Sequence, residues 1–384
     1  MNRLTAGWAD TATGGTVFSA AGVWPLLAFL ADGAHGAARA ELADAVGLPA
    51  EQAAAGAREL LAAMGSMPGL RSALGLWTGR EQAVREEWRS GLPADTHGVL
   101  TDELPAGQRA LDAWAAERTD GLIERLPVQL DPGVGMVLAS AFALRTEWPR
   151  PFEELPLMPE AGPWQGRRLA GLRRTGVRLD RAGVAGGPYG YVTELKVPGD
   201  HGIDVHLLLG EERMTPGQVL GTGLAALARR IAVVPSGQLP YGEVGPGLRI
   251  GQQPCATPRQ PELSVTTVAY DVTARHDLLD RPGLFGLTTA MDTAAGHFPG
   301  ISPAPLAVGR AGQSAVARFG ALGFRAGAAT AVAPAPAGAR PDLSFTTTVV
   351  TARFDRPFGF LAVQRASRLV LTAGWVTEPV PYQG

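Results

Sequence analysis

The sequence predicts an α+β fold in a single domain, with helices at the start and mixed strands after them. Helical periodicity is concentrated before residue 127, whereas strand-like apolar runs dominate from residue 136 onwards. Few regular strand–helix–strand repeats occur, which argues against a doubly wound fold and for one large mixed sheet. Glycine and proline occur throughout, with 50 and 31 copies, so no stretch stands out as a linker and we expect residues 1–384 to form one domain.

The composition is that of a globular protein and limits the possible partners. Of 384 residues, 46% are hydrophobic and 18% are charged, which supplies ample material for a large core. The net charge of −2 gives no bulk attraction to nucleic acid or to an anionic membrane, so we expect neither as a partner. Lys196 is the only lysine among 34 basic residues, which indicates a GC-rich coding sequence and not a selection of arginine for its chemistry.

The beginning of the chain and its single cysteine suggest a compartment and exclude some chemistry. Cys255 stands alone, so neither an internal disulfide nor a metal site with several cysteines can form. The first ten residues contain Asp10 and no long apolar run, and Pro25 interrupts the apolar residues 22–31. We therefore expect no signal peptide, no transmembrane helix and a cytoplasmic location.

The first third of the chain is predicted to be mainly helical. Residues 17–19 form a short strand-like run, and residues 20–34 form a helix that is apolar on nearly all faces and therefore buried. Residues 36–46 are amphipathic and end at Gly47, a residue typical of helix C-caps. The remaining elements of this part are a helix over 51–64, a strand over 70–77 and a helix over 106–126.

Strands dominate the rest of the chain. Residues 136–148 form a long apolar run that suits a central strand buried on both faces. Residues 150–187 are rich in proline and glycine and contain only short strand candidates. The later elements are strands over 191–197 and 203–209, a helix over 221–232, a half-buried strand over 263–272, a helix over 277–285, a strand over 314–319 and a terminal strand pair over 360–363 and 369–376.

One long segment near the C-terminus, residues 321–360, differs from the other connections. Small residues with strand-compatible ends surround a middle part made of proline, alanine and glycine. The segment has too few large apolar groups to pack as core, and its prolines prevent a regular hydrogen-bonded ladder. A long exposed loop of this kind is usually either functional or disordered.

Five blocks of the sequence, in order, resemble the serpin family over nearly the whole chain. The blocks are residues 17–27, similar to the first buried helix and the serine that enters it; Asp112, Trp114, Thr119, Gly121 and Ile123, similar to an Asn-x-Trp…Thr-x-Gly-x-Ile helix; residues 137–148, similar to the central strand that ends in a tryptophan; residues 314–319, similar to the strand that feeds the loop; and residues 356–360, similar to the near-signature Arg-Pro-Phe-x-Phe. Because five blocks occur in the right order, the resemblance predicts the serpin fold.

The resemblance implies an architecture, a mechanism and a partner. N-terminal helices should pack on a large mixed central sheet, with further β-sheets and an exposed reactive-centre loop, here residues 321–356 with its hinge. A serine protease cleaves the loop while joined to it as an acyl-enzyme, and the first part of the loop then inserts into the sheet and distorts the protease. The family therefore implies a monomeric suicide-substrate inhibitor of serine proteases that needs no cofactor.

The resemblance also assigns residues beneath the loop. Ser19, Ser140, Trp148 and Gln313 fall at the shutter and breach, the parts of the sheet that open when a loop inserts. Ser140 stands where many relatives carry asparagine, and Gln313 stands where they often carry histidine. The shutter is therefore expected to be atypical.

The hinge combines a favourable run with an unusual entry. Fast insertion requires small side chains, and the matching residues are Gly323, Ala326, Gly327, Ala328, Ala329 and Thr330. The departures are Ala321, where the family usually has glutamate, and Phe324 and Arg325, where it has Thr-Glu. Side chains alternate along a strand, so Phe324 would turn inward with Ala326 and Ala328. Overpacking a tight site costs about 1–3 kcal/mol, which would slow insertion about tenfold or more.

The scissile bond has three candidates. Arg340 is the only basic residue between the hinge and Arg353, and it suits a trypsin-like protease, although Pro341 follows it. Leu343 and Phe345 suit a chymotrypsin-like or subtilisin-like protease. The spacing from the hinge and the spacing from Pro357 disagree, so the choice stays open.

Other residues that could carry chemistry favour structural roles. His201 and His206 lie five apart on a strand-like run and should face opposite sides, so we expect no metal site there. The pattern contains neither a Gly-x-Ser-x-Gly elbow nor a phosphate loop, and Cys255 in a Pro-rich stretch lacks a neighbouring histidine. We therefore expect no enzyme.

A second hypothesis comes from another class. The departures at Ala321, Phe324 and Arg325 favour a non-inhibitory scaffold that binds a ligand or partner, or that has been recruited to a biosynthetic reaction. The small-residue run from Ala326 onwards favours inhibition instead.

Overall fold

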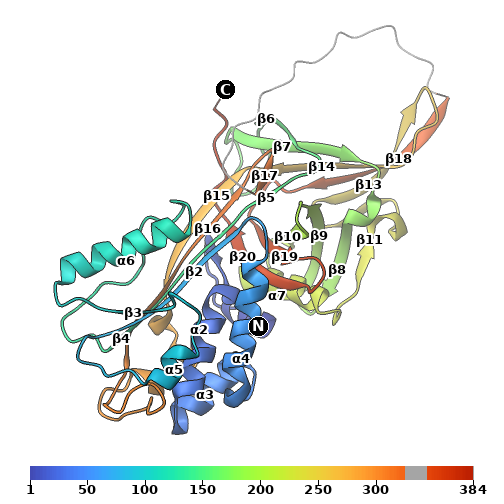
Figure 1. The fold of residues 1–384 in the computed structure, drawn as a ribbon. Coiled ribbons are helices and arrows are strands. Elements are labelled where there is room, and N and C mark those ends of the chain that lie inside the picture. Colours follow the sequence, from blue (N-terminus) through green and yellow to red (C-terminus); the bar gives the residue numbers. More distant parts are fainter. Residues whose placement is uncertain (325–343, 384) are drawn as a thin grey trace.

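The computed structural model describes residues 1–324 and 344–383, and Figure 1 shows how their elements are arranged. The helices are α1 (Asn2–Ala9), α2 (Ala20–Gly33), α3 (Gly36–Val46), α4 (Ala50–Gly65), α5 (Glu86–Ser90), α6 (Leu104–Arg118), α7 (Pro216–Leu227) and α8 (Pro282–Phe285). Most helices precede the main body of strands, which confirms the predicted α+β class.

A mixed five-stranded sheet lies at the centre of the fold, in the order β15-β16-β4-β2-β3. Its strands are β2 (Leu70–Thr78), β3 (His97–Val99), β4 (Met136–Leu144), β15 (Tyr270–Asp277) and β16 (Val308–Phe319). β16 and β4 are parallel neighbours, whereas β15 is antiparallel to β16 and β2 is antiparallel to β4. We call the line along which β4 and β16 are hydrogen-bonded the seam.

Two further sheets pack beside the central one. The seven-stranded sheet contains β1 (Thr16–Phe18), β20 (Leu369–Val376), β19 (Phe358–Gln364), β10 (Ile203–Gly210), β9 (Gly190–Pro198), β8 (Ala182–Gly187) and β11 (Val233–Pro235). The six-stranded sheet contains β12 (Gly242–Gly245), β13 (Leu248–Cys255), β18 (Phe345–Arg353), β14 (Glu262–Val268), β7 (Leu169–Gly176) and β6 (Glu153–Leu157). A two-stranded ladder joins β17 (Gly323–Phe324) to β5 (Thr146–Glu147) near the upper end of the central sheet (Figure 1).

Helices cover both faces of the central sheet. Ala139 and Ala141 of β4 share an apolar cluster with Leu111 of α6, whereas Leu138 joins the cluster that contains α2 (Figure 1). Every residue of β4 is buried, as predicted from its long and mainly apolar sequence. The central strand therefore lies inside the molecule on both faces.

Several predicted elements lie elsewhere than expected. The helix expected over 221–232 is α7, which begins at Pro216 because Thr215 and Gln218 form a capping box. The single strand expected over 263–272 is two strands in different sheets, β14 and β15, since Ala269 leaves the ladder to pair with Ala170 and Val380. The helix expected over 277–285 is reduced to a 3-10 turn and the one-turn helix α8.

Two other expectations for irregular stretches were wrong. Residues 150–187 contain the eight-residue β7 as well as β6 and β8, because glycine and proline are tolerated where strands are twisted or lie at an edge. Cys255 ends strand β13 and is buried, instead of lying in a loop. Within the described residues, no helix has both the length and the apolar character needed to cross a membrane.

Candidate functional site

The hinge of the predicted loop turns back on itself directly after β16. The chain leaves the strand at Phe319, and the Gly320 N–H donates to the carbonyl of Gly323 at 2.9 Å, which closes a tight turn. Gly323 and Phe324 then run antiparallel to β5, opposite Glu147 and Thr146. A Cβ at Gly323 would lie 2.4 Å from the carbonyl oxygen of Thr146, so only glycine fits this approach.

The residues that follow β5 hold the turn from the other side. The indole Nε1–H of Trp148 donates to the Gly320 carbonyl at 2.9 Å, and its backbone N–H donates to the Leu322 carbonyl at 2.9 Å. The N–H of Phe152 donates to the Ala321 carbonyl at 2.8 Å. Trp148 therefore contacts the turn at residues 320–322 directly.

Phe324 is already in the core before any cleavage. Its side chain is 0% exposed, and its ring lies 6.0 Å from the ring of Phe360. The sequence predicted a steric cost when this ring turns inward; in the structure the inward site exists and the ring occupies it. The expected barrier at Phe324 therefore does not follow from lack of space.

Ala321 is buried together with Phe324. It is 1% exposed and belongs to the same apolar cluster as Phe324. A glutamate at this position would place a carboxylate in apolar surroundings, which is costly without a partner. Two of the departures from the family pattern thus have one physical cause, which is a hinge that packs into the core.

Three of the predicted shutter residues meet under the seam. The Gln313 side-chain oxygen accepts from the Ser19 N–H at 2.7 Å, and its Nε2 donates to the Ser19 carbonyl at 2.8 Å and to Ser140 Oγ at 3.3 Å. Ser19 Oγ donates to the Leu371 carbonyl at 2.6 Å and accepts from the Gly22 N–H, which caps α2. The seam is therefore tied to α2 and β20 through Ser19.

Sequence reasoning missed Asp200, which supports the hinge from β5. Its Oδ1 accepts from Thr146 Oγ1 at 2.6 Å and from the Glu147 N–H at 2.9 Å. Partial burial acts to raise the pKa of Asp200, but these hydrogen bonds outweigh it and hold the pKa below its usual value. The local sequence around Asp200 indicates a turn, and nothing in it signals pairing with residues 146–147.

The other loop residues fall on both sides of the described boundary. Phe345 is the first residue of β18, opposite Cys255, and is 45% exposed. A bond inside a hydrogen-bonded strand is a poorer protease substrate than one in an exposed loop tip, which disfavours Phe345 as the scissile residue. The residues of the predicted site that lie outside the described part of the chain are Arg325, Ala326, Gly327, Ala328, Ala329, Thr330, Arg340 and Leu343.

The histidines that the sequence offered for other chemistry take structural roles. His206 is buried and its Nδ1 lies 2.6 Å from Glu194, whereas His201 lies in a turn beside Asp200. Burial acts to raise the pKa of Glu194, yet the contacts with His206 and Lys196 hold it below its usual value. Among the described residues, no three metal-binding side chains gather closely enough to hold an ion.

Comparison with known proteins finds similar sequences and a matching family model. A family model described as Serpin (serine protease inhibitor) matches residues 3–160. Serpin-Z6C of Oryza sativa subsp. japonica is 26% identical over 395 residues, which cover 96% of this chain and 91% of the relative. The chain is similar to serpins over nearly its whole length. Serpin-Z6A of the same organism, 26% identical over 94% of this chain and 93% of its own length, extends the similarity.

Solved structures show that the chain has the serpin fold. Human thyroxine-binding globulin, in complex with its ligand, superimposes with a TM-score of 0.73 at 16% identity, covering 99% of this chain and 96% of that one. The thermophilic serpin Tengpin in its native state gives 0.73 at 14% identity, covering 98% and 92%. Native protease nexin-1 with heparin gives 0.72 at 15% identity, covering 98% and 99%. At these identities the similarity concerns the fold alone.

Proposed function

We propose that this serpin inhibits a serine protease by taking part of residues 325–343 into its central sheet as a strand between β4 and β16. The observation that carries this proposal is β17, because its two residues already run antiparallel to β5 at the upper end of the seam. A strand that continues from Phe324 would meet β4 in the direction that an inserted strand needs.

The sequence beyond Phe324 matches the length of β4. Continuing the register of β17 places Ala326 opposite Leu144, Thr330 opposite Ser140 and Pro334 opposite Met136. The first proline therefore falls opposite the first residue of β4. The residues before it all have a backbone N–H that can donate to a ladder. Small side chains fall on the face that Phe324 already shares with Leu144.

The chemistry of trapping needs no catalytic group of the serpin. The protease serine attacks the carbonyl of the scissile residue, the peptide bond breaks, and an ester joins the new carboxyl terminus to the enzyme. Insertion then competes with attack of water on that ester. Each residue that enters the sheet exchanges solvent contacts for a buried ladder, which supplies the driving force.

The proposal is tested by incubating the protein separately with subtilisin-like, chymotrypsin-like and trypsin-like serine proteases. An SDS-stable species with the summed mass of serpin and protease is expected with at least one of them. Cleavage within residues 325–343 that leaves active protease and no such species would contradict inhibition.

A swap of two neighbouring residues provides the matched control. The double variant Arg325→Ala with Ala326→Arg keeps composition and charge, but it moves the guanidinium to the position facing inward with Phe324. We expect this variant to be cleaved as a substrate without trapping, because insertion would bury an unpaired charge. Arg325→Ala alone should trap as the unmodified protein does.

A ligand-binding scaffold is the second candidate. The buried Phe324 and Ala321 favour it, because they anchor the hinge in the intact protein. The structural neighbour thyroxine-binding globulin was solved with thyroxine bound. Clean cleavage by every protease tested, without a rise in the melting temperature, would favour this candidate.

A further inference from the structure

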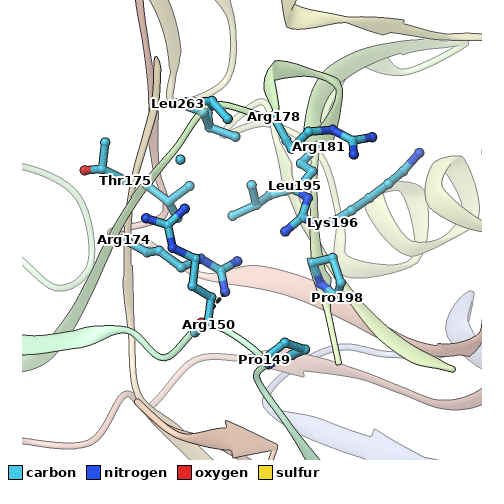
Figure 2. Close-up of a pocket in the computed structure, with 13 residues that line it drawn as sticks. Pro149, Arg150, Arg174, Thr175, Arg178, Arg181, Leu195, Lys196, Pro198 and Leu263 are labelled. Carbon is cyan, nitrogen blue, oxygen red and sulfur yellow. Dashed lines mark hydrogen bonds between the residues drawn. The ribbon is translucent and has the colours of Figure 1, made fainter. Parts of the chain in front are cut away.

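A cavity of about 320 Å³ lies between the six-stranded and the seven-stranded sheets, away from the seam (Figure 2). β7, β9 and β14 form its walls, and the segment after β5 closes one side. Five cationic side chains line it, namely Arg150, Arg174, Arg178, Arg181 and Lys196. Figure 2 shows Arg150 and Arg174 on one side of the cavity and Arg181 on the opposite side.

Two of the five cations already have carboxylate partners. Arg178 donates from Nε and Nη2 to the two carboxylate oxygens of Asp180, at 2.9 and 2.8 Å, and Lys196 lies 3.4 Å from Glu194. The remaining three, Arg150, Arg174 and Arg181, take part in none of the ion pairs formed by residues 1–324 and 344–383.

The nearby carboxylates cannot neutralise these three arginines. Asp204 is close enough to influence Arg181, but both of its oxygens contact Arg365, at 2.5 and 2.9 Å. Glu194 is held by His206 at 2.6 Å. Within the described part of the chain, the cavity thus keeps an excess of positive charge that no carboxylate balances.

Burial makes this excess costly. Desolvation, with smaller contributions from Arg181 and Arg150, lowers the pKa of Arg174 to about 10. Burial and the neighbouring Arg178 also lower the pKa of Arg181. A bound anion would relieve both effects, because it replaces lost hydration and screens the repulsion between like charges.

The residues that line the cavity beside the cations restrict which ligands it can bind. Leu195, Leu263 and Val265 form an apolar wall, and Pro149 and Pro198 add rigid apolar surface. Guanidinium groups bind phosphate and carboxylate oxygens through paired hydrogen bonds. The cavity lies at the lower end of the size range of small-molecule sites.

We propose that this cavity is a binding site for a small anion with two or more negative charges, carried by phosphate or carboxylate groups. Arg150, Arg174 and Arg181 bind the charged oxygens, and the apolar wall contacts the rest of the ligand. None of its lining residues belongs to the seam, and the proposal does not depend on protease inhibition.

Calorimetric titration with pyrophosphate and with citrate tests the proposal, with acetate at matched ionic strength as the monovalent control. Binding of pyrophosphate, of citrate or of both, without comparable binding of acetate, is expected. Pyrophosphate alone would identify a phosphate site, and citrate alone a polycarboxylate site. If both bind no better than acetate, the proposal is wrong.

Variants locate the site. We expect Arg181→Gln to weaken binding at least about tenfold, and Arg174→Gln to do the same, since each removes one charge-assisted contact. Arg174 also stacks 4.2 Å over the Phe152 ring, so its variant can affect folding, and Arg181→Gln provides the independent measurement. Arg249→Gln, at an arginine that is 69% exposed and paired with Glu243, should leave binding unchanged. Equal loss in the Arg249 and Arg181 variants would indicate nonspecific surface binding and overturn the proposal.

Discussion

The burial of Phe324 explains why position 321 carries an apolar residue, Ala321. Each departs from the family pattern, and each is almost completely buried in the same apolar cluster. A large ring at the hinge requires an apolar neighbour at the turn, because a carboxylate there would have no water. The hinge of this protein is therefore anchored by hydrophobic contact.

Removal of the Phe324 ring should measure the strength of that anchor. Phe324→Ala is expected to lower the free energy of unfolding by about 3–5 kcal/mol, because it leaves a cavity beside Phe360. Urea unfolding followed by tryptophan fluorescence gives this value. Phe345→Ala, at a phenylalanine that is 45% exposed, serves as the control and should change stability by about 0.5 kcal/mol or less. Similar small losses in both variants would show that Phe324 does not anchor the hinge.

His276 should make the protein sensitive to mild acid. Burial lowers its pKa most strongly, the Val17 carbonyl acts in the opposite direction, and Arg281 lowers the pKa further. The folded protein therefore takes up a proton less readily than the unfolded chain, whose histidine titrates near pH 6.5. Stability is retained above about pH 6.5 and falls below it, by at most about 1.4 kcal/mol per pH unit for this residue.

Unfolding free energies at about pH 7 and about pH 5.5 test the role of His276. His276→Gln should reduce the loss over this interval, whereas His35→Gln, at an exposed histidine, should leave it unchanged. Some loss will persist in the first variant, because burial and Arg89 also lower the pKa of His97. An identical pH dependence in both variants would exclude His276 as a contributor.

At the scale of elements, the seam is held unequally by its two strands. Gln313 on β16 makes hydrogen bonds of 2.7 and 2.8 Å to Ser19, but only one of 3.3 Å across to Ser140 on β4. Separation of β4 from β16 would therefore break the weakest of these side-chain contacts and leave the others in place. The polar network stabilises the sheet without locking β4 to β16.

Variants at the two ends of that contact should differ in stability. Gln313→Leu leaves the buried Ser19 N–H without its acceptor, which is expected to cost about 1–3 kcal/mol of unfolding free energy. Ser140→Ala removes only the 3.3 Å contact and should cost about 1 kcal/mol or less. Denaturant unfolding of both variants gives the comparison. A larger loss from Ser140→Ala would mean that the network does lock β4 to β16.

Elements with strong apolar patterns could be predicted from the sequence, and those that depend on distant partners could not. The buried strand β4 and the terminal pair β19–β20 follow from long, mainly apolar runs, which admit few alternatives. The division of residues 263–272 between two sheets depends on backbone partners at Ala170 and Val380, far away in the chain. The same holds at the site, where motifs identified Ser19, Gln313 and Trp148, but the burial of Phe324 depends on a cluster assembled from several strands.

At the scale of the whole molecule, insertion would convert a mixed sheet into one with an additional central strand. Cleavage within residues 325–343 is expected to raise the melting temperature by about 10 °C or more, because several new ladder hydrogen bonds and buried side chains stabilise the product. Differential scanning calorimetry before and after proteolysis measures the rise. The double variant Arg325→Ala with Ala326→Arg should be cleaved without it. A melting temperature that does not rise after cleavage of the unmodified protein would exclude insertion.

The cation-lined cavity also contains Lys196, the only lysine of the chain, whose side chain is 42% exposed. An acylating reagent that targets primary amines therefore has a single lysine to modify in this sequence. Mass spectrometry of the peptide that contains Lys196 detects the modification. The fraction of Lys196 that becomes acylated can therefore be measured at a single residue. A ligand that protects this amine from acylation would report directly how much of the cavity is occupied.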